Sequence, residues 1–153
     1  MLSVSAGVLT GFVLYLLTNL RGNKIHRIQC GLDALKPLCD SLENATKTIF
    51  YRESQQLNTT CSRDVFELFR SAMQDVEYSR NALPDRVEHE LGYDDFDPLN
   101  KDLISKYVDQ FQGSEDDSAL AEIRNELCLI KKQISELIAE KEIQLSFLFS
   151  VMI

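Results

Sequence analysis

The feature that most constrains the fold is an uncharged, mostly apolar stretch over residues 2–20. Three basic residues, Arg21, Lys24 and Arg27, follow it directly. As a helix this stretch would be ~28 Å long, close to the ~30 Å thickness of the hydrocarbon layer of a bilayer. The sequence therefore predicts a single membrane-spanning anchor over residues 1–20, with the three basic side chains in contact with lipid headgroups.

The distribution of charge predicts the orientation of this anchor. Residues 21–52 hold six Lys or Arg against three Asp or Glu, whereas residues 53–153 hold ten against twenty-one. Because positive charge flanks the cytoplasmic end of membrane helices, we expect a cytoplasmic C-terminal domain. The strongly acidic remainder argues against generic nucleic-acid binding, which needs clustered positive charge.

Two other interpretations of the first twenty residues stay open. One is a cleaved secretory signal, although no Lys or Arg precedes the apolar stretch and residues 18–22 make a poor cleavage site. Glycosylation-type triplets at Asn44 and Asn58 favour that interpretation, and the four cysteines, Cys30, Cys39, Cys61 and Cys128, would then form two disulfides. The other is a helix buried in a soluble protein. In a cytoplasmic domain the cysteines would be reduced.

Apolar spacing predicts a mainly α fold in one small domain. A 3-4 spacing over residues 25–49 predicts a basic helical connector over residues 21–53, with a break near Gly22 or a bend near Pro37. Residues 54–153 read as an acidic helical domain with helices over 62–76, 83–91 and 99–113. The tail alternates apolar residues from position 143 to 153, so a short C-terminal β-strand and a continuing helix are both possible.

Two patterns predict self-association. Small residues recur every fourth position in the anchor, at Ser3, Gly7 and Gly11, a spacing that lets membrane helices approach closely. Segment 118–141 carries three heptads whose leucine and isoleucine order favours trimers or tetramers, or else packing within its own domain. The heptad residues are Leu120, Ile123, Leu127, Ile130, Ile134 and Leu137.

No catalytic, cofactor or metal motif is present in the sequence. His26 and His89 lack an evident partner, and no glycine-rich phosphate loop or paired cysteine ligands occur. We therefore expect no enzymatic activity, cofactor or metal. The predicted function is a membrane-anchored oligomeric adaptor or effector that binds lipid, itself and an unidentified ligand or protein. By analogy of architecture alone, one version is a cyclic-nucleotide-sensing membrane effector of prokaryotic antiviral defence. The alternative is a secreted, disulfide-bonded helical signalling protein.

Overall fold

The computed structural model describes residues 2–54, 63–113 and 117–150, with the side chains of α1 described from Thr10 onward. Within these ranges the chain forms five α-helices and no strand, which confirms the mainly α class. The helices are α1 (Leu2–Ser54), α2 (Arg63–Asn81), α3 (Asp85–Leu91), α4 (Lys101–Gly113) and α5 (Asp117–Ser150).

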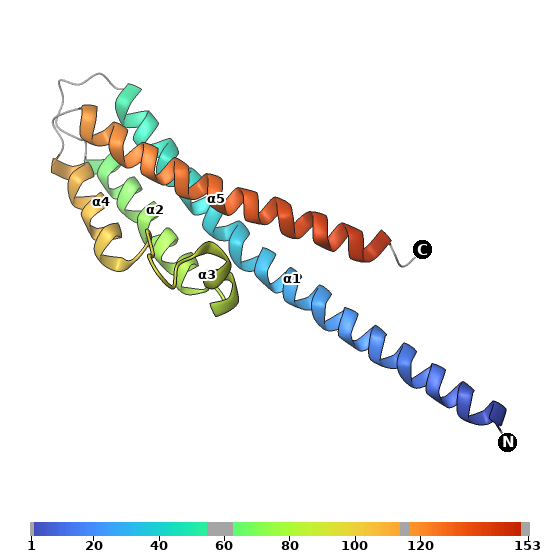
Figure 1. The fold of residues 1–153 in the computed structure, drawn as a ribbon. Coiled ribbons are helices and arrows are strands. Elements are labelled where there is room, and N and C mark those ends of the chain that lie inside the picture. The colour runs from blue at the N-terminus through green and yellow to red at the C-terminus, as the bar shows by residue number, and fades with distance from the viewer. Residues whose placement is uncertain (1, 55–62, 114–116, 151–153) are drawn as a thin grey trace.

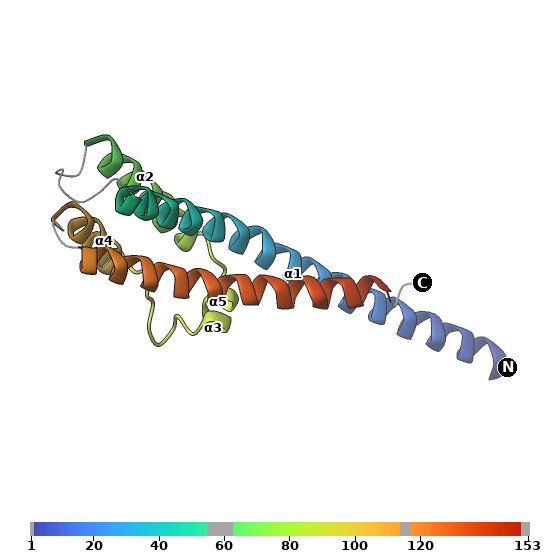
Figure 2. The same ribbon diagram turned by 90° about the horizontal axis from the view of Figure 1, so that it is seen from above.

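Four of the helices form an antiparallel bundle, and the short α3 lies in the connection between α2 and α4 (Figure 1). The long α1 packs against both α2 and α5, and α4 packs against the same two helices. In both views the N-terminal half of α1 extends well past the end of α5 (Figure 2). The packed core therefore involves only the C-terminal half of α1.

The core is largely aliphatic, as the 3-4 spacing predicts. The α1 face over residues 28–49 is buried, with Leu35, Leu42 and Ile49 fully inaccessible to solvent. At the end of the bundle away from the N-terminus, the rings of Phe69 and Phe111 stack with their centroids 4.1 Å apart. Burial of these apolar side chains is the main stabilising contribution to the bundle.

The expected break near Gly22 is wrong, because α1 runs through Gly22, Gly31 and Pro37 as one continuous helix. A proline inside a helix costs about 3 kcal/mol, since it removes one hydrogen bond and crowds the preceding turn. Leu35 and Leu38 lie on either side of Pro37 and are fully buried. Their packing in the bundle outweighs the local penalty.

The expectation of a C-terminal strand is also corrected, because α5 remains helical through Ser150. The helical alternative explains the apolar residues better: Leu145 and Leu148 are half-buried, whereas Ile143 and Phe147 are exposed. A strand needs a neighbouring strand for its main-chain hydrogen bonds, and the described residues offer none. Residues 151–153 lie outside the described part of the chain.

The search for a membrane-spanning segment gave a negative result. Among the residues that the structure describes, no helix combines the length and the apolar character needed to cross a bilayer. The expected single membrane-spanning helix therefore gains no support from the structure.

Candidate functional site

Residues 10–20 of α1 expose large apolar side chains on all sides. Phe12 and Leu20 leave 60% and 66% of their surface accessible, and similar exposure is found for Val13, Leu14, Tyr15, Leu16 and Leu17. A helix that packs on a soluble core is apolar on one face only, whereas a helix that is apolar all round is normally surrounded by protein or lipid. We call residues 10–20 the apolar extension. Its exposure marks it as an interaction surface.

The predicted small-residue stripe lies in this part of α1. An added Cβ at Gly11 would meet no atom of the described residues within 4 Å, so none of them occupies that side of the helix. The side chain of Ser3 and the surroundings of Gly7 lie outside the described residues. Close packing of two such helices stays a prediction.

The basic residues that follow the apolar extension divide into two kinds. Lys24 and Arg27 are exposed, whereas Arg21 is partly buried between α1 and α5. The Arg21 guanidinium donates a hydrogen bond to the main-chain carbonyl oxygen of Leu148, and its Nε is buried without a hydrogen-bond partner among the described residues. Arg21 therefore joins the last turns of α5 to the start of the charged part of α1.

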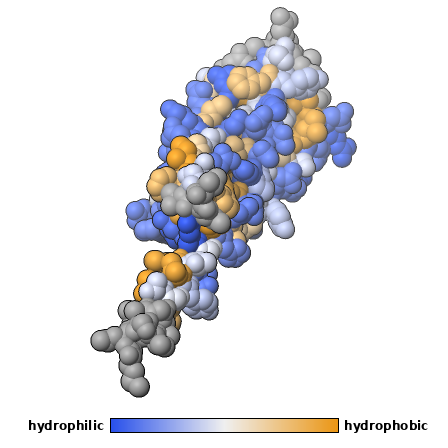
Figure 3. Space-filling model, turned by 90° about the vertical axis from the view of Figure 1, so that its right-hand side faces the viewer, coloured by the Kyte–Doolittle hydropathy of each residue, from blue (hydrophilic) through white to orange (hydrophobic). Residues whose placement is uncertain are grey.

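The last two turns of α5, residues 143–150, form a second exposed apolar surface, which we call the α5 end. Ile143 and Phe147 lie four residues apart and are 70% and 67% exposed, and Phe149 is also exposed. Apolar atoms gather near both chain ends, while polar atoms cover much of the bundle beyond them (Figure 3). The sequence left the tail as either a strand or a helix and did not place it beside Arg21.

The predicted oligomerisation residues occupy a different place. Leu120, Ile123, Leu127, Ile130 and Ile134 are buried inside the single chain, and Leu137 is partly buried against the same core. Their heptad spacing is thus explained by packing against helices of their own domain, the alternative that the sequence left open. Self-association through this face would require the bundle to open.

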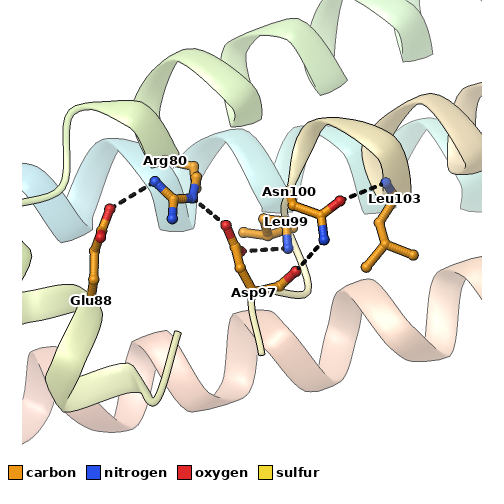
Figure 4. Close-up of polar contacts among 6 residues, drawn as sticks. All are labelled: Arg80, Glu88, Asp97, Leu99, Asn100 and Leu103. Atoms are coloured by element: carbon orange, nitrogen blue, oxygen red, sulfur yellow. Dashed lines mark hydrogen bonds and ion pairs between the residues drawn. The ribbon is translucent and has the colours of Figure 1, made fainter. Parts of the chain in front are cut away.

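Polar contacts hold the connection between α2 and α4 in place (Figure 4). Arg80 pairs with Asp97 at 2.5 Å and with Glu88 at 2.7 Å. The other carboxylate oxygen of Asp97 accepts a hydrogen bond from the Leu99 N–H at 2.8 Å. Partial burial acts to lower the pKa of Arg80, but its carboxylate partners outweigh this effect and raise it. Arg80 therefore stays charged, and its role is to fix the connection.

The same connection is tied to α4 by Asn100. Its side-chain oxygen accepts a hydrogen bond from the Leu103 N–H at 2.9 Å, and its amide donates to the carbonyl of Asp97. The first of these bonds caps the start of α4. The sequence analysis did not identify either role of Asn100.

A second partly buried ion pair joins α3 to α5. Lys141, which is almost fully buried, donates to the carboxylate of Glu90. Partial burial acts to raise the pKa of Glu90, but the hydrogen bonds and charges of Lys141 and Arg86 outweigh it and lower the pKa. An added Cβ at Gly31 would lie 3.3 Å from Cε of Lys141, so a small residue in α1 makes room for this lysine.

The two histidines and the three described cysteines form no recognisable reactive site. His89 lies 2.5 Å from Asp94 in an exposed pair, and the Cys30 thiol lies 3.7 Å from a ring nitrogen of His26 on the surface of α1. In the described ranges, no three His, Cys, Asp or Glu side chains lie close enough to hold a metal ion. Cys30, Cys39 and Cys128 are free thiols, and Cys61 lies outside the described residues.

One groove of about 460 Å³ lies between α2 and α4. Phe66, Met73, Ile104 and Val108 supply its apolar lining, and charged side chains such as Arg70 also line it. A surface with this mixture of groups can accept a peptide or a small molecule.

The chain was compared with known proteins at three levels. No protein-family model, no curated protein and no solved structure matches it.

Proposed function

We propose that this protein is a membrane-attached, non-enzymatic adaptor or effector, held in the bilayer by the N-terminal part of α1. The observation that carries the proposal is the exposure of large apolar side chains around the whole circumference of the apolar extension. The sequence of residues 2–9 continues the same uncharged composition. Burial of such a surface in lipid is strongly favourable, whereas its exposure to water is not.

The basic residues support attachment to an anionic membrane surface. Lys24 and Arg27 are exposed directly after the apolar extension, where each basic side chain contributes on the order of 1 kcal/mol to binding at an anionic leaflet. The same residues would place the bundle on the cytoplasmic side. The proposed localisation is thus the membrane, with the C-terminal domain in the cytoplasm.

The bundle would supply the specific interactions. Its acidic surface and the groove between α2 and α4 are the places for a protein or ligand to bind. Any homo-oligomer would form through the apolar extension, because the heptad residues of α5 already pack inside the chain. The narrower version, a cyclic-nucleotide-sensing effector of antiviral defence, rests only on the analogy of architecture.

The alternative of a secreted bundle with two disulfides fits the structure less well. Two disulfides among four cysteines need at least one bond among Cys30, Cys39 and Cys128, and all three are free. The Asn44 triplet is also unfavourable for glycosylation, since its Thr46 is buried in α1 and donates to the carbonyl of Leu42 at 2.7 Å.

Cell fractionation tests the proposed attachment. The full chain, expressed with a reporter after Ile153, should stay in the membrane pellet after alkaline carbonate extraction. The reporter should be protected from protease in intact cells and digested after lysis. Recovery in the carbonate supernatant would overturn the attachment, and digestion of the reporter in intact cells would overturn the orientation.

A further inference from the structure

We propose that the α5 end is a second membrane contact, which seats the bundle against the lipid headgroups beside the α1 anchor. This inference rests on the proposed function, because it takes the membrane attachment of α1 as its starting point. It goes beyond that function by assigning a partner to a surface at the opposite end of the chain. The partner is the interfacial layer of an anionic bilayer.

The first step of the inference concerns where α5 ends relative to the length of α1. Leu148 accepts the hydrogen bond of Arg21, so the last turns of α5 lie beside the first charged residue of α1. Residues 2–20 extend beyond that level by ~28 Å of helix, close to the ~30 Å hydrocarbon thickness. If this part of α1 lies along the membrane normal, the α5 end lies at the headgroup boundary.

The second step is the distribution of charge along α5. Its last charged residue is Glu142, and residues 143–150 contain none. Glu142 forms a 2.9 Å ion pair with Lys36, and Lys141 is held by Glu90. Both charged groups are therefore directed to the bundle, and the helix loses its charge over the turns that approach Arg21. The change from charged to uncharged residues in α5 thus lies near the corresponding change in α1.

The third step is the orientation of the exposed side chains. Leu145 and Leu148 are half-buried, whereas Ile143 and Phe147 are exposed on another side of the helix. Phenylalanine and leucine on the apolar face of a helix, next to basic residues, are typical of helices that lie in the membrane interface. Lys24 and Arg27 supply the basic residues here, since both are exposed on the adjacent part of α1. An anionic lipid surface matches both the apolar and the basic groups.

Tryptophan fluorescence can locate the α5 end in a bilayer. The chain contains no tryptophan, so each single substitution introduces a unique reporter. We would reconstitute full-length Phe147→Trp and Phe12→Trp variants in vesicles of equal parts phosphatidylcholine and phosphatidylglycerol carrying brominated acyl chains. The control is Phe50→Trp, an exposed position thirty residues beyond Leu20 on α1, which is ~45 Å along the helix.

Two sets of vesicles are compared, one with bromine on the acyl chains near the headgroups and one with bromine near the acyl-chain ends at the bilayer centre. We expect the first set to quench the tryptophan fluorescence of the Phe147→Trp variant more than the second. The Phe12→Trp variant should show the reverse order, and the Phe50→Trp control should not be quenched. Quenching of the Phe12→Trp variant alone would overturn the second contact and leave the proposed attachment intact. Absence of quenching in both variants would overturn the attachment as well.

A second copy of the chain is the competing partner for the α5 end. Without lipid, the emission of the Phe147→Trp variant should not depend on protein concentration. An emission that shifts to the blue as the concentration rises would show that a second copy covers this surface, and would also overturn the inference.

Discussion

The guanidinium of Arg21 donates a hydrogen bond to the main-chain carbonyl of Leu148, a residue 127 positions further along the chain. This contact joins the two exposed apolar segments of the molecule. Arg21 is the first charged residue of α1, and Leu148 lies six residues beyond Glu142, the last charged residue of α5. It is the structural relationship on which the membrane-proximal arrangement depends.

Replacement of Arg21 by methionine should loosen the α5 end without unfolding the bundle. The substitution removes the donor to Leu148 but keeps an unbranched apolar side chain between the helices. Hydrogen exchange should become faster for the amides of residues 143–150 and stay unchanged for residues 120–137. The exposed Lys24→Met variant serves as the control. Equal exchange in the two variants would mean that Arg21 does not hold α5.

Replacement of Asp97 by alanine should destabilise the bundle by about 2 kcal/mol, because it removes a partly buried partner of Arg80 and the acceptor for the Leu99 N–H. The matched control is Asp94→Ala, which breaks only the exposed pair with His89 and should change stability by less than about 0.5 kcal/mol. Chemical denaturation measures both. Equal losses would show that the buried connection contributes nothing beyond a surface pair.

The lowered pKa of the Glu90 carboxylate should make the stability of the folded protein depend on pH. Its pKa in the folded protein lies below the ordinary value of 4.5, so the folded state favours the ionised form. Its contribution is complete above the unfolded pKa and is lost as the pH falls through the folded pKa. The loss of stability between pH 5 and more acidic solutions should therefore be smaller in Glu90→Gln. An unchanged acid dependence would contradict this role for Glu90.

The heptad residues of α5 should behave as core residues of a single chain. Ile134→Ala should destabilise the protein by about 2–5 kcal/mol, since it opens a cavity in a fully buried position. The exposed Leu129→Ala is the control and should change stability by less than about 0.5 kcal/mol. The loss of stability in Ile134→Ala should be the same at low and at high protein concentration. A loss that grows with concentration would show that these residues also stabilise an oligomer.

The helices were predictable where local sequence and tertiary packing agree. Pro84 in front of α3 and Gly113 at the end of α4 are local signals that the structure follows. Pro37 does not end α1, because the buried leucines around it keep the helix continuous through a residue that would end an isolated helix. The strength of that packing is a property of the whole bundle and cannot be obtained from the residues around Pro37.

The candidate site was predictable only in part. The apolar stretch and the basic residues after it are contiguous in sequence, so their proximity needs no knowledge of the fold. The α5 end is different, since its place beside Arg21 depends on the antiparallel packing of helices more than a hundred residues apart. The heptad spacing of α5 fits an intermolecular and an intramolecular partner equally well. Only the fold identifies the partner as α1 and the other helices of the same chain.

The most direct test of membrane attachment is flotation of purified full-length variants with anionic vesicles on a density gradient. One double variant, Leu14→Glu with Leu17→Glu, introduces two charges into the apolar extension. The control double variant, Leu68→Glu with Leu129→Glu, introduces two charges on the surface of the bundle. All four leucines are between 58% and 60% exposed, so the two variants differ in position and not in burial. We predict that the control floats like the unsubstituted protein and that the Leu14 and Leu17 variant stays at the bottom of the gradient, because charged side chains are costly in the hydrocarbon layer. Equal flotation of the two variants, or failure of the unsubstituted protein to float, would contradict the account.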